Sequence, residues 1–159
     1  EDIVAGEGAS YSLLIGMNDV FEKVVERTAR ETVDGRDGWS VEGQARTDNL
    51  LRGDPSIRMR PDFVVKRHGE PVLVGDAKWK TKVKNNDVYQ VVAYQTAYDA
   101  PGVLVYPDND GAVENDYSVK NGYSLAMLEL PTGVNTTDVG EFGRENAERF
   151  FAFLSRTLG

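Results

Sequence analysis

The stretch "RPDFVVKRHGEPVLVGDAKWK" (residues 60–80) contains two short apolar runs on either side of a turn. The runs Phe63–Val65 and Val72–Val74 consist of residues that favour strands, and a turn near Gly69 separates them. A connection of this length joins two adjacent antiparallel strands. The sequence therefore predicts a β-hairpin in the middle of the chain.

Two aspartates stand at equal distances from the turn of this hairpin. Asp62 precedes the first strand and Asp76 ends the second, so antiparallel pairing about residue 69 places them opposite each other. Two carboxylates in that arrangement repel each other unless a cation lies between them. Mg²⁺ and Mn²⁺ suit such hard oxygen ligands and are often held by one or two carboxylates plus substrate phosphate oxygens. The pair indicates a candidate metal site.

Lysines follow the second aspartate at every second position. Successive side chains alternate between the faces of a strand, so Lys78 is expected to project from the same face as Asp76. There it would orient an attacking water and stabilise charge that develops on a phosphate. The later lysines would continue this face outward, where they and Arg60 would contact a DNA backbone: Lys80, Lys82 and Lys84. The alternative is a solvated strand edge whose lysines prevent aggregation.

The charge of the chain is unevenly distributed. Its 159 residues include 18 Lys and Arg and 26 Asp and Glu, which gives a formal net charge of −8. Residues 58–84 nevertheless hold eight basic and three acidic side chains, a local net charge of +5. A basic patch on an otherwise acidic protein favours an anionic partner, such as nucleic acid, at this one place.

The remaining segments predict helices on both sides of a mixed sheet. Helical spacing of apolar residues indicates a first helix over residues 11–31, capped by Ser12 or Asn18, and Asn85 or Asn86 would cap the second. The order α-β-β-β-α-β-β-α predicts a three-layer α/β domain that spans residues 1–159, with 1–10 as a flexible or linker segment. Further helices are predicted at 85–100 and 141–158, strands at 39–46, 102–107 and 123–131, and loops at 48–59 and 108–122.

A longer motif runs through the hairpin. Pro61-Asp62, thirteen intervening residues and Asp76-Ala77-Lys78 match the PD-(D/E)xK signature of restriction-endonuclease-like nucleases. The wider sequence resembles McrC, the nuclease subunit of 5-methylcytosine restriction systems. Four segments carry the resemblance in order across most of residues 11–107: "LLIGMNDVFEKVVERTAR", "RPDFVVKRHGEPVLVGDAKWK", "DVYQVVAY" and "GVLVYP". It implies a restriction-endonuclease-like fold with a mixed central sheet flanked by helices.

The resemblance also implies an activity, a cofactor and partners. The chain would be a metal-dependent DNA endonuclease domain, the cleavage subunit of a McrBC-like modification-dependent restriction system. It would act with Mg²⁺ or Mn²⁺ bound by Glu22, Asp62 and Asp76. Its partners would be DNA and a GTPase motor subunit of McrB type, engaged through an N-terminal region that we expect to be missing from this chain. The implied catalytic residues are Glu22, Asp62, Asp76, Lys78 and Gln90.

Other interpretations remain open for the function and for single residues. A RecB-like repair exonuclease would share the same catalytic face, and an inactive DNA-binding or assembly module would share the fold. Glu22 would otherwise be a solvated helix residue, and Gln90 would otherwise hydrogen-bond the strand ends. Trp79 is predicted to pack under the second helix, and Tyr89 and Tyr94 are predicted to be core aromatics.

Composition excludes several classes of protein. The chain has no cysteine, so disulfides, thiolate zinc sites and cysteine-ligated iron–sulfur clusters are excluded, and a reducing, cytoplasmic location is expected. The single histidine, His68, excludes any mechanism that needs two. No apolar run approaches the roughly 20 residues of a membrane-spanning helix.

Overall fold

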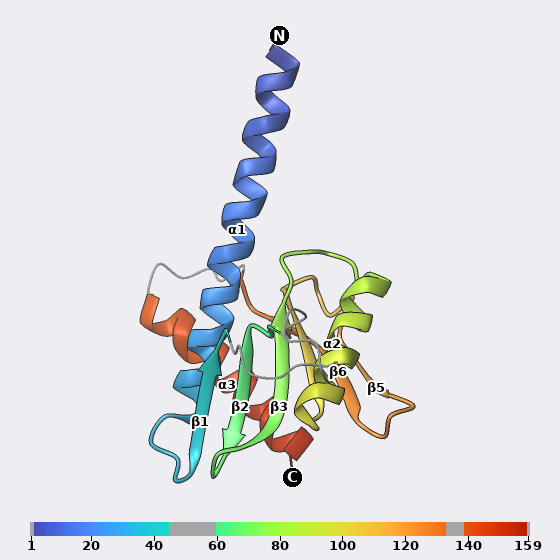
Figure 1. Cartoon of the computed structure of the whole chain (residues 1–159). Helices are drawn as coiled ribbons and strands as arrows, with labels where there is room; N and C mark the ends of the chain where they lie inside the picture. The colour runs from blue at the N-terminus through green and yellow to red at the C-terminus, as the bar shows by residue number, and fades with distance from the viewer. Residues whose placement is uncertain (1, 45–59, 133–138, 159) are drawn as a thin grey trace.

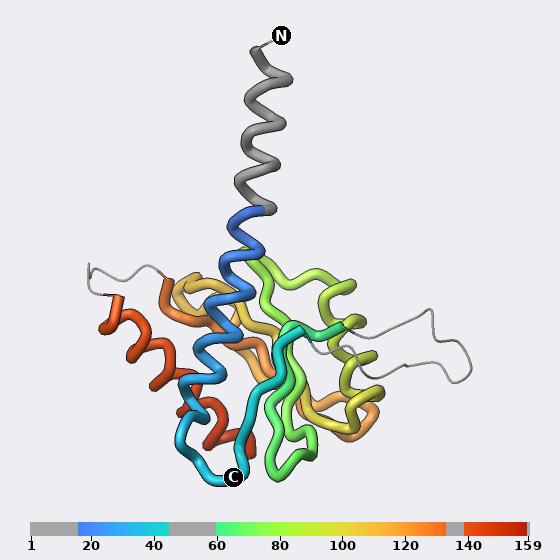
Figure 2. The backbone as a smooth tube through the Cα atoms, turned by 60° about the vertical axis from the view of Figure 1, so that its left-hand side comes forward, coloured from blue at the N-terminus to red at the C-terminus, as the bar shows by residue number. Residues whose placement is uncertain are grey.

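The structure is a computed structural model that describes residues 2–44, 60–132 and 139–158. A six-stranded sheet lies between α1 and α3 on one face and α2 on the other (Figure 1), which confirms the predicted three-layer α/β fold. Figure 2 shows α1 and α3 beside each other on their common face. The elements are α1 (Asp2–Val33), β1 (Trp39–Gly43), β2 (Phe63–Arg67), β3 (Glu70–Ala77), α2 (Asn85–Tyr98), β4 (Gly102–Pro107), β5 (Asn115–Ser118), β6 (Ser124–Leu130) and α3 (Val139–Leu158).

The sheet is mixed, with the strand order β1-β2-β3-β4-β6-β5. The pairs β1–β2, β2–β3 and β5–β6 are antiparallel, whereas β3–β4 and β4–β6 are parallel. All six residues of β4 are buried, as expected for a continuous apolar strand covered on both faces. The exposed edge strand β5 lies within the predicted loop 108–122, so that part of the prediction was wrong.

The hairpin of β2 and β3 has the register that the sequence predicted. His68 and Gly69 form a two-residue turn with φ angles of 51° and 85°, so both have the left-handed backbone that a type I′ turn requires. A β-bulge after Val65 offsets the position of this turn, and Phe63 pairs with Gly75. The next position outward on each strand is an aspartate, so Asp62 and Asp76 lie together at the end of the ladder.

A close approach between Phe63 and Gly75 fixes this register against the core. The Phe63 ring is fully buried and meets Phe150 of α3 edge to face, with 5.9 Å between ring centroids. A β-carbon on Gly75 would stand 2.2 Å from the Phe63 ring, so only glycine leaves room for it. Because side chains alternate, Asp62 and Asp76 share the opposite face with Val64 and Val74, which pack toward α2.

The helix ends differ from the predicted ones. α1 begins at Asp2, nine residues before the predicted start, so Asn18 lies inside the helix and is not its cap. The N-cap of α2 is Lys84, and not Asn85 or Asn86 as the sequence predicted. The Asp87 carboxylate accepts the Lys84 backbone N–H at 3.2 Å. The domain limits stay a prediction, and the predicted loop 48–59 lies outside the described residues.

Two aromatic residues do not lie where the sequence placed them. Trp79 packs edge to face against Phe21 of α1, with 5.4 Å between centroids, and not under α2. Tyr94 belongs to the core beneath α2 as predicted, but Tyr89 is 66% exposed. No helix in the described ranges is long and apolar enough to cross a membrane.

Candidate active site

The two aspartates at the end of the hairpin are buried and tied to each other's backbone. The backbone N–H of Asp62 donates to Asp76 Oδ1 at 3.2 Å, and the N–H of Ala77 donates to Asp62 Oδ2 at 2.8 Å. Only 8% of Asp62 and 3% of Asp76 is exposed. The fold therefore holds two carboxylates side by side where β3 reaches the surface.

Lys78 extends from the same edge and pairs with Asp76. Its backbone N–H donates to the Val105 carbonyl at 2.8 Å, which carries the parallel ladder one residue beyond β3. Its ammonium lies 2.7 Å from Asp76 Oδ2 and donates to Gln90 Oε1 at 2.9 Å. Burial acts to lower the Lys78 pKa, but the charges of Asp76, Asp87 and Asp62 raise it overall, so this lysine stays protonated.

A second helix holds Gln90 in place. Gln90 lies in the first half of α2, and its amide donates to the Tyr94 hydroxyl at 2.8 Å. That hydroxyl donates in turn to the backbone carbonyl of Arg60 at 3.2 Å, just before Asp62. The hydrogen bonds thus connect Lys78, Gln90, Tyr94 and Arg60 around the carboxylate pair.

Glu22 lies on α1 near the same aspartate pair. Its carboxylate accepts a hydrogen bond from Asn18 Nδ2 at 2.8 Å, and Asn18 Oδ1 accepts the Trp79 backbone N–H at 3.4 Å. Burial and the charges of Asp76 and Asp19 raise the pKa of Glu22. The charge on Glu22 therefore interacts with the aspartate pair, although no hydrogen bond joins it to either aspartate among the described contacts.

Burial and mutual repulsion change the acidity of the pair. Burial and the neighbouring Asp76 charge raise the pKa of Asp62 from 3.8 to about 8. Without a metal ion, Asp62 therefore keeps its proton at neutral pH, even though the Lys78 ammonium lies against Asp76. This is the electrostatic behaviour expected of carboxylates arranged to bind a metal ion.

The donor set fits Mg²⁺ through two carboxylates. In the described residues, no group of three or more His, Asp or Glu side chains is arranged to hold a metal. Asp62 and Asp76 nevertheless supply the one or two protein carboxylates that Mg²⁺ commonly takes, leaving other positions for water and phosphate oxygens. Metal binding by Glu22 stays a prediction.

The lysines after Lys78 do not continue the strand, so they do not share one strand face as the sequence predicted. The Lys80 N–H bonds back to the Lys78 carbonyl at 2.9 Å, which turns the chain away from the strand. Lys80, Lys82 and Lys84 instead line one groove beside Trp79 and Pro107. The Lys80 ammonium pairs with Asp87 at 2.8 Å, whereas Lys82 and Lys84 form no ion pair with a carboxylate in the described ranges. Arg60 is exposed nearby, and its DNA contact stays a prediction.

A family model matches the part of the chain that contains the candidate site. The model of the family described as McrBC 5-methylcytosine restriction system component matches residues 2–107, about two thirds of the chain. The chain belongs to this McrBC family. The matched span includes all five predicted catalytic residues, from Glu22 to Gln90. A search of curated proteins gave no match.

A solved structure shares the fold of this McrBC family member. It is the refined half-complex from the tetradecameric assembly of Thermococcus gammatolerans McrB AAA+ hexamers with bound McrC. The similarity has a TM-score of 0.66 at 16% sequence identity and covers 86% of this chain. It covers 33% of that chain, so the sequence spans about a third of the length of its match.

Three residues around the site were not predicted to have a role there. Gln44 Nε2 donates to Asp62 Oδ1 at 3.2 Å, and Asn18 connects α1 to the segment after β3. Asp87 is only 4% exposed and joins Lys80 to the start of α2. Asp87 had a sequence signal, because an acidic residue in the first helical turn is typical of a cap. Asn18 also had one, because it lies four residues before Glu22 on the same predicted helix, where side chains are neighbours. Gln44 reaches the site only through tertiary packing.

The raised pKa of Asp62 predicts an unusual pH dependence of stability. The folded protein retains a proton that the unfolded chain releases, so metal-free stability falls as pH rises from about 4 to about 8. Asp62→Asn removes this loss, and its free energy of unfolding should exceed that of the wild type by roughly a few kcal/mol at pH 8 and by little at pH 4. Urea unfolding across this range without metal measures the difference. A constant difference between the two proteins would contradict the assignment.

Proposed function

We propose that this chain is the DNA-cleaving domain of a McrC-type subunit and hydrolyses phosphodiester bonds with Mg²⁺ or Mn²⁺. The observation that carries the proposal is the position of Asp76, which lies against Asp62 on one side and 2.7 Å from the Lys78 ammonium on the other. A carboxylate pair able to bind a metal ion next to a fixed cation suits metal-assisted hydrolysis of a phosphodiester.

The carboxylates are the proposed metal ligands. Asp62 and Asp76 would hold the ion, and Glu22 at the rim of the site would bind it directly or through water. When bound, the ion would polarise the scissile phosphate and lower the pKa of the attacking water. Before metal binds, burial and then the neighbouring Asp76 charge raise the pKa of Asp62, so a cation at this place would be stabilised, and this supports the assignment.

Lys78 is the proposed source of positive charge in the reaction. Asp76 and Gln90 fix its ammonium from two directions, and Gln90 is itself held by Tyr94. A protonated lysine in this position would orient the attacking water and stabilise negative charge on the phosphate. Because these hydrogen bonds already exist in the free protein, little reorganisation would accompany the reaction.

The proposed path of the DNA backbone follows the groove of lysines. Lys82 and Lys84 are exposed and line the same groove as Lys80, a few residues beyond Lys78. Lys80 is partly neutralised by Asp87, so it contributes less to phosphate binding. Contacts of this kind are independent of base sequence, and recognition of a methylated base is assigned to another part of the system.

A motor partner is the last part of the proposal. The similar solved structure contains McrB AAA+ hexamers with bound McrC. By analogy, we infer that this domain acts as part of a subunit that engages a GTPase motor of McrB type through a region outside the 159 residues. The motor would deliver DNA to a domain whose net charge of −8 repels it at long range.

Cleavage of plasmid DNA tests the proposed chemistry. Asp76→Asn should abolish Mg²⁺-dependent nicking because a ligand charge is lost at nearly constant shape, and Lys78→Ala should slow it by about 10²–10³-fold. Asp110→Asn, the same change at an exposed loop carboxylate outside the site, is the matched control and should cut like the wild type. Wild-type rates in Asp76→Asn would contradict the proposal. Cutting of linear but not circular DNA would indicate an exonuclease.

Salt dependence of DNA binding tests the groove. Lys82→Ala combined with Lys84→Ala should weaken duplex binding equally for all sequences and reduce the slope of log affinity against log salt by ~1.8, or ~0.9 for each phosphate contact. These two lysines are chosen because removing Lys80 would also leave the buried Asp87 unpaired. Lys120→Ala, at an exposed position between β5 and β6, is the control. An unchanged slope would identify the lysines as a solvated edge.

A further inference from the structure

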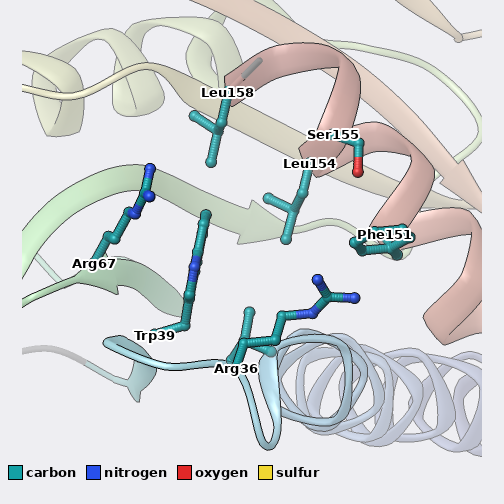
Figure 3. A pocket seen from close by; sticks show the side chains of 8 residues that line it. Arg36, Trp39, Arg67, Phe151, Leu154, Ser155 and Leu158 are labelled. Carbon is teal, nitrogen blue, oxygen red and sulfur yellow. The ribbon is translucent and has the colours of Figure 1, made fainter.

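A small pocket lies where the end of α1, the start of β1 and the last turns of α3 meet (Figure 3). Its volume is about 250 Å³. Val33 and Leu154 supply buried apolar surface, and the half-buried Trp39 and Leu158 form further walls. Figure 3 shows Leu154 and Leu158 pointing into the space beside Trp39. The pocket is therefore a depression with a largely apolar floor that opens to solvent.

Two arginines flank this apolar surface. Arg36 lies over the Phe151 ring at 4.1 Å from its centroid, and Arg67 lies over the Trp39 ring at 5.6 Å. Both arginines are exposed, and neither forms an ion pair with a carboxylate in the part of the chain that the structure describes. Arg36 Nε donates to the Thr32 carbonyl at 3.0 Å, whereas stacking on a ring occupies only the flat face of a guanidinium, so the terminal N–H groups of both arginines face outward for a carboxylate. The pocket thus joins an apolar floor to two unpaired cations.

The size of the pocket favours one inserted side chain over a cofactor. Small-molecule sites usually enclose about 300–1,000 Å³, which is more than this pocket offers. A single apolar side chain in a pocket with arginines beside it is a common anchor at protein interfaces. Carboxylates on either side of that anchor would complement Arg36 and Arg67.

The position of the pocket argues against a DNA duplex as its occupant. Arg67 ends β2, whereas Asp62 stands just before its start, so about 17 Å of strand separates them. The pocket also lies on the α1 and α3 side of the sheet, whereas the aspartates share the α2 side with Val64 and Val74. A duplex bound at the aspartates would follow the opposite face and edge.

We propose that this pocket is a docking site for an acidic peptide segment of a partner protein. One apolar side chain of the segment inserts beside Leu154 and Trp39, and carboxylates before and after it pair with the two arginines. The site is independent of the proposed nuclease activity. The rest of this acidic protein, with its net charge of −8, repels such a segment, so binding is confined to the pocket.

Binding of three labelled peptides to the 159-residue chain tests the proposal. The probes are EEFEE, EEAEE without the apolar anchor, and KKFKK with reversed charge, each followed by fluorescence anisotropy at low salt. EEFEE should bind at least fivefold more tightly than EEAEE and should weaken with added salt, and KKFKK should not compete with it. Equal binding of EEFEE and EEAEE would overturn the proposal, because the pocket would then have no role.

Variants of the pocket locate the binding. Arg36→Gln and Arg67→Gln should each weaken EEFEE binding at least fivefold, and Ser155→Trp, at an exposed lining position, should fill the pocket and abolish binding. Arg27→Gln, at an exposed arginine of α1 outside the pocket, is the control and should bind like the wild type. Thermal unfolding of each variant checks that it folds.

Two other outcomes would replace the proposal. If Arg36→Gln and Arg67→Gln weakened binding of a 20-base-pair duplex and not of EEFEE, the pocket would be a nucleic-acid contact. If sedimentation velocity showed a dimer that Ser155→Trp dissociates, the occupant would be a second copy of this chain. Either result would exclude an acidic partner segment as the occupant.

Discussion

The electrostatic repulsion between Asp62 and Asp76 is the constraint on which the arrangement of the site depends. Both carboxylates are buried, and each accepts a hydrogen bond from the backbone around the other. The hairpin cannot separate them, because Phe63 lies directly over Gly75 one position further in and fixes the register. The Lys78 ammonium lies against Asp76, yet burial and the Asp76 charge still raise the pKa of Asp62 to about 8, so a proton or a metal ion must compensate the second negative charge.

Two helices from opposite layers of the fold complete the site at the end of the β2–β3 hairpin. α2 brings Gln90 and Tyr94 against Lys78 and the Arg60 backbone, and α1 brings Asn18 and Glu22 against the segment that follows β3. Since the contacts come from both helices and from the hairpin between them, the geometry exists only when all three layers are packed. The fold thus holds these groups in place in advance, which is the condition under which fixed charges would act most strongly in the proposed hydrolysis. The pocket at the end of α1, the start of β1 and the last turns of α3 shares no lining residue with this site.

Local sequence patterns predicted the hairpin, its register, the buried strand β4 and the three-layer fold, because each rests on strand or helix periodicity and on turn chemistry. The aspartate pair and Lys78 followed from the register alone.

The same reasoning failed where tertiary contacts decide the outcome. β5 has four exposed polar and aromatic residues and forms only because β6 offers it an edge. Trp79 faces α1 because the chain turns after Lys78, and Lys80 meets Asp87 for the same reason. Gln44 carries no motif, and its contact with Asp62, like that of Asn18 with the Trp79 backbone, depends on the packing of distant segments.

The proposed binding of a divalent metal ion by Asp62 and Asp76 can be tested by anomalous diffraction from a crystal soaked in Mn²⁺. We expect one anomalous density peak between the carboxylates of Asp62 and Asp76, with the Lys78 ammonium still held beside Gln90. The peak should be absent from crystals of Asp76→Asn that are treated in the same way. No peak at this position in the wild type, at a Mn²⁺ concentration that supports cleavage, would contradict the account, as would a peak that persists unchanged in Asp76→Asn.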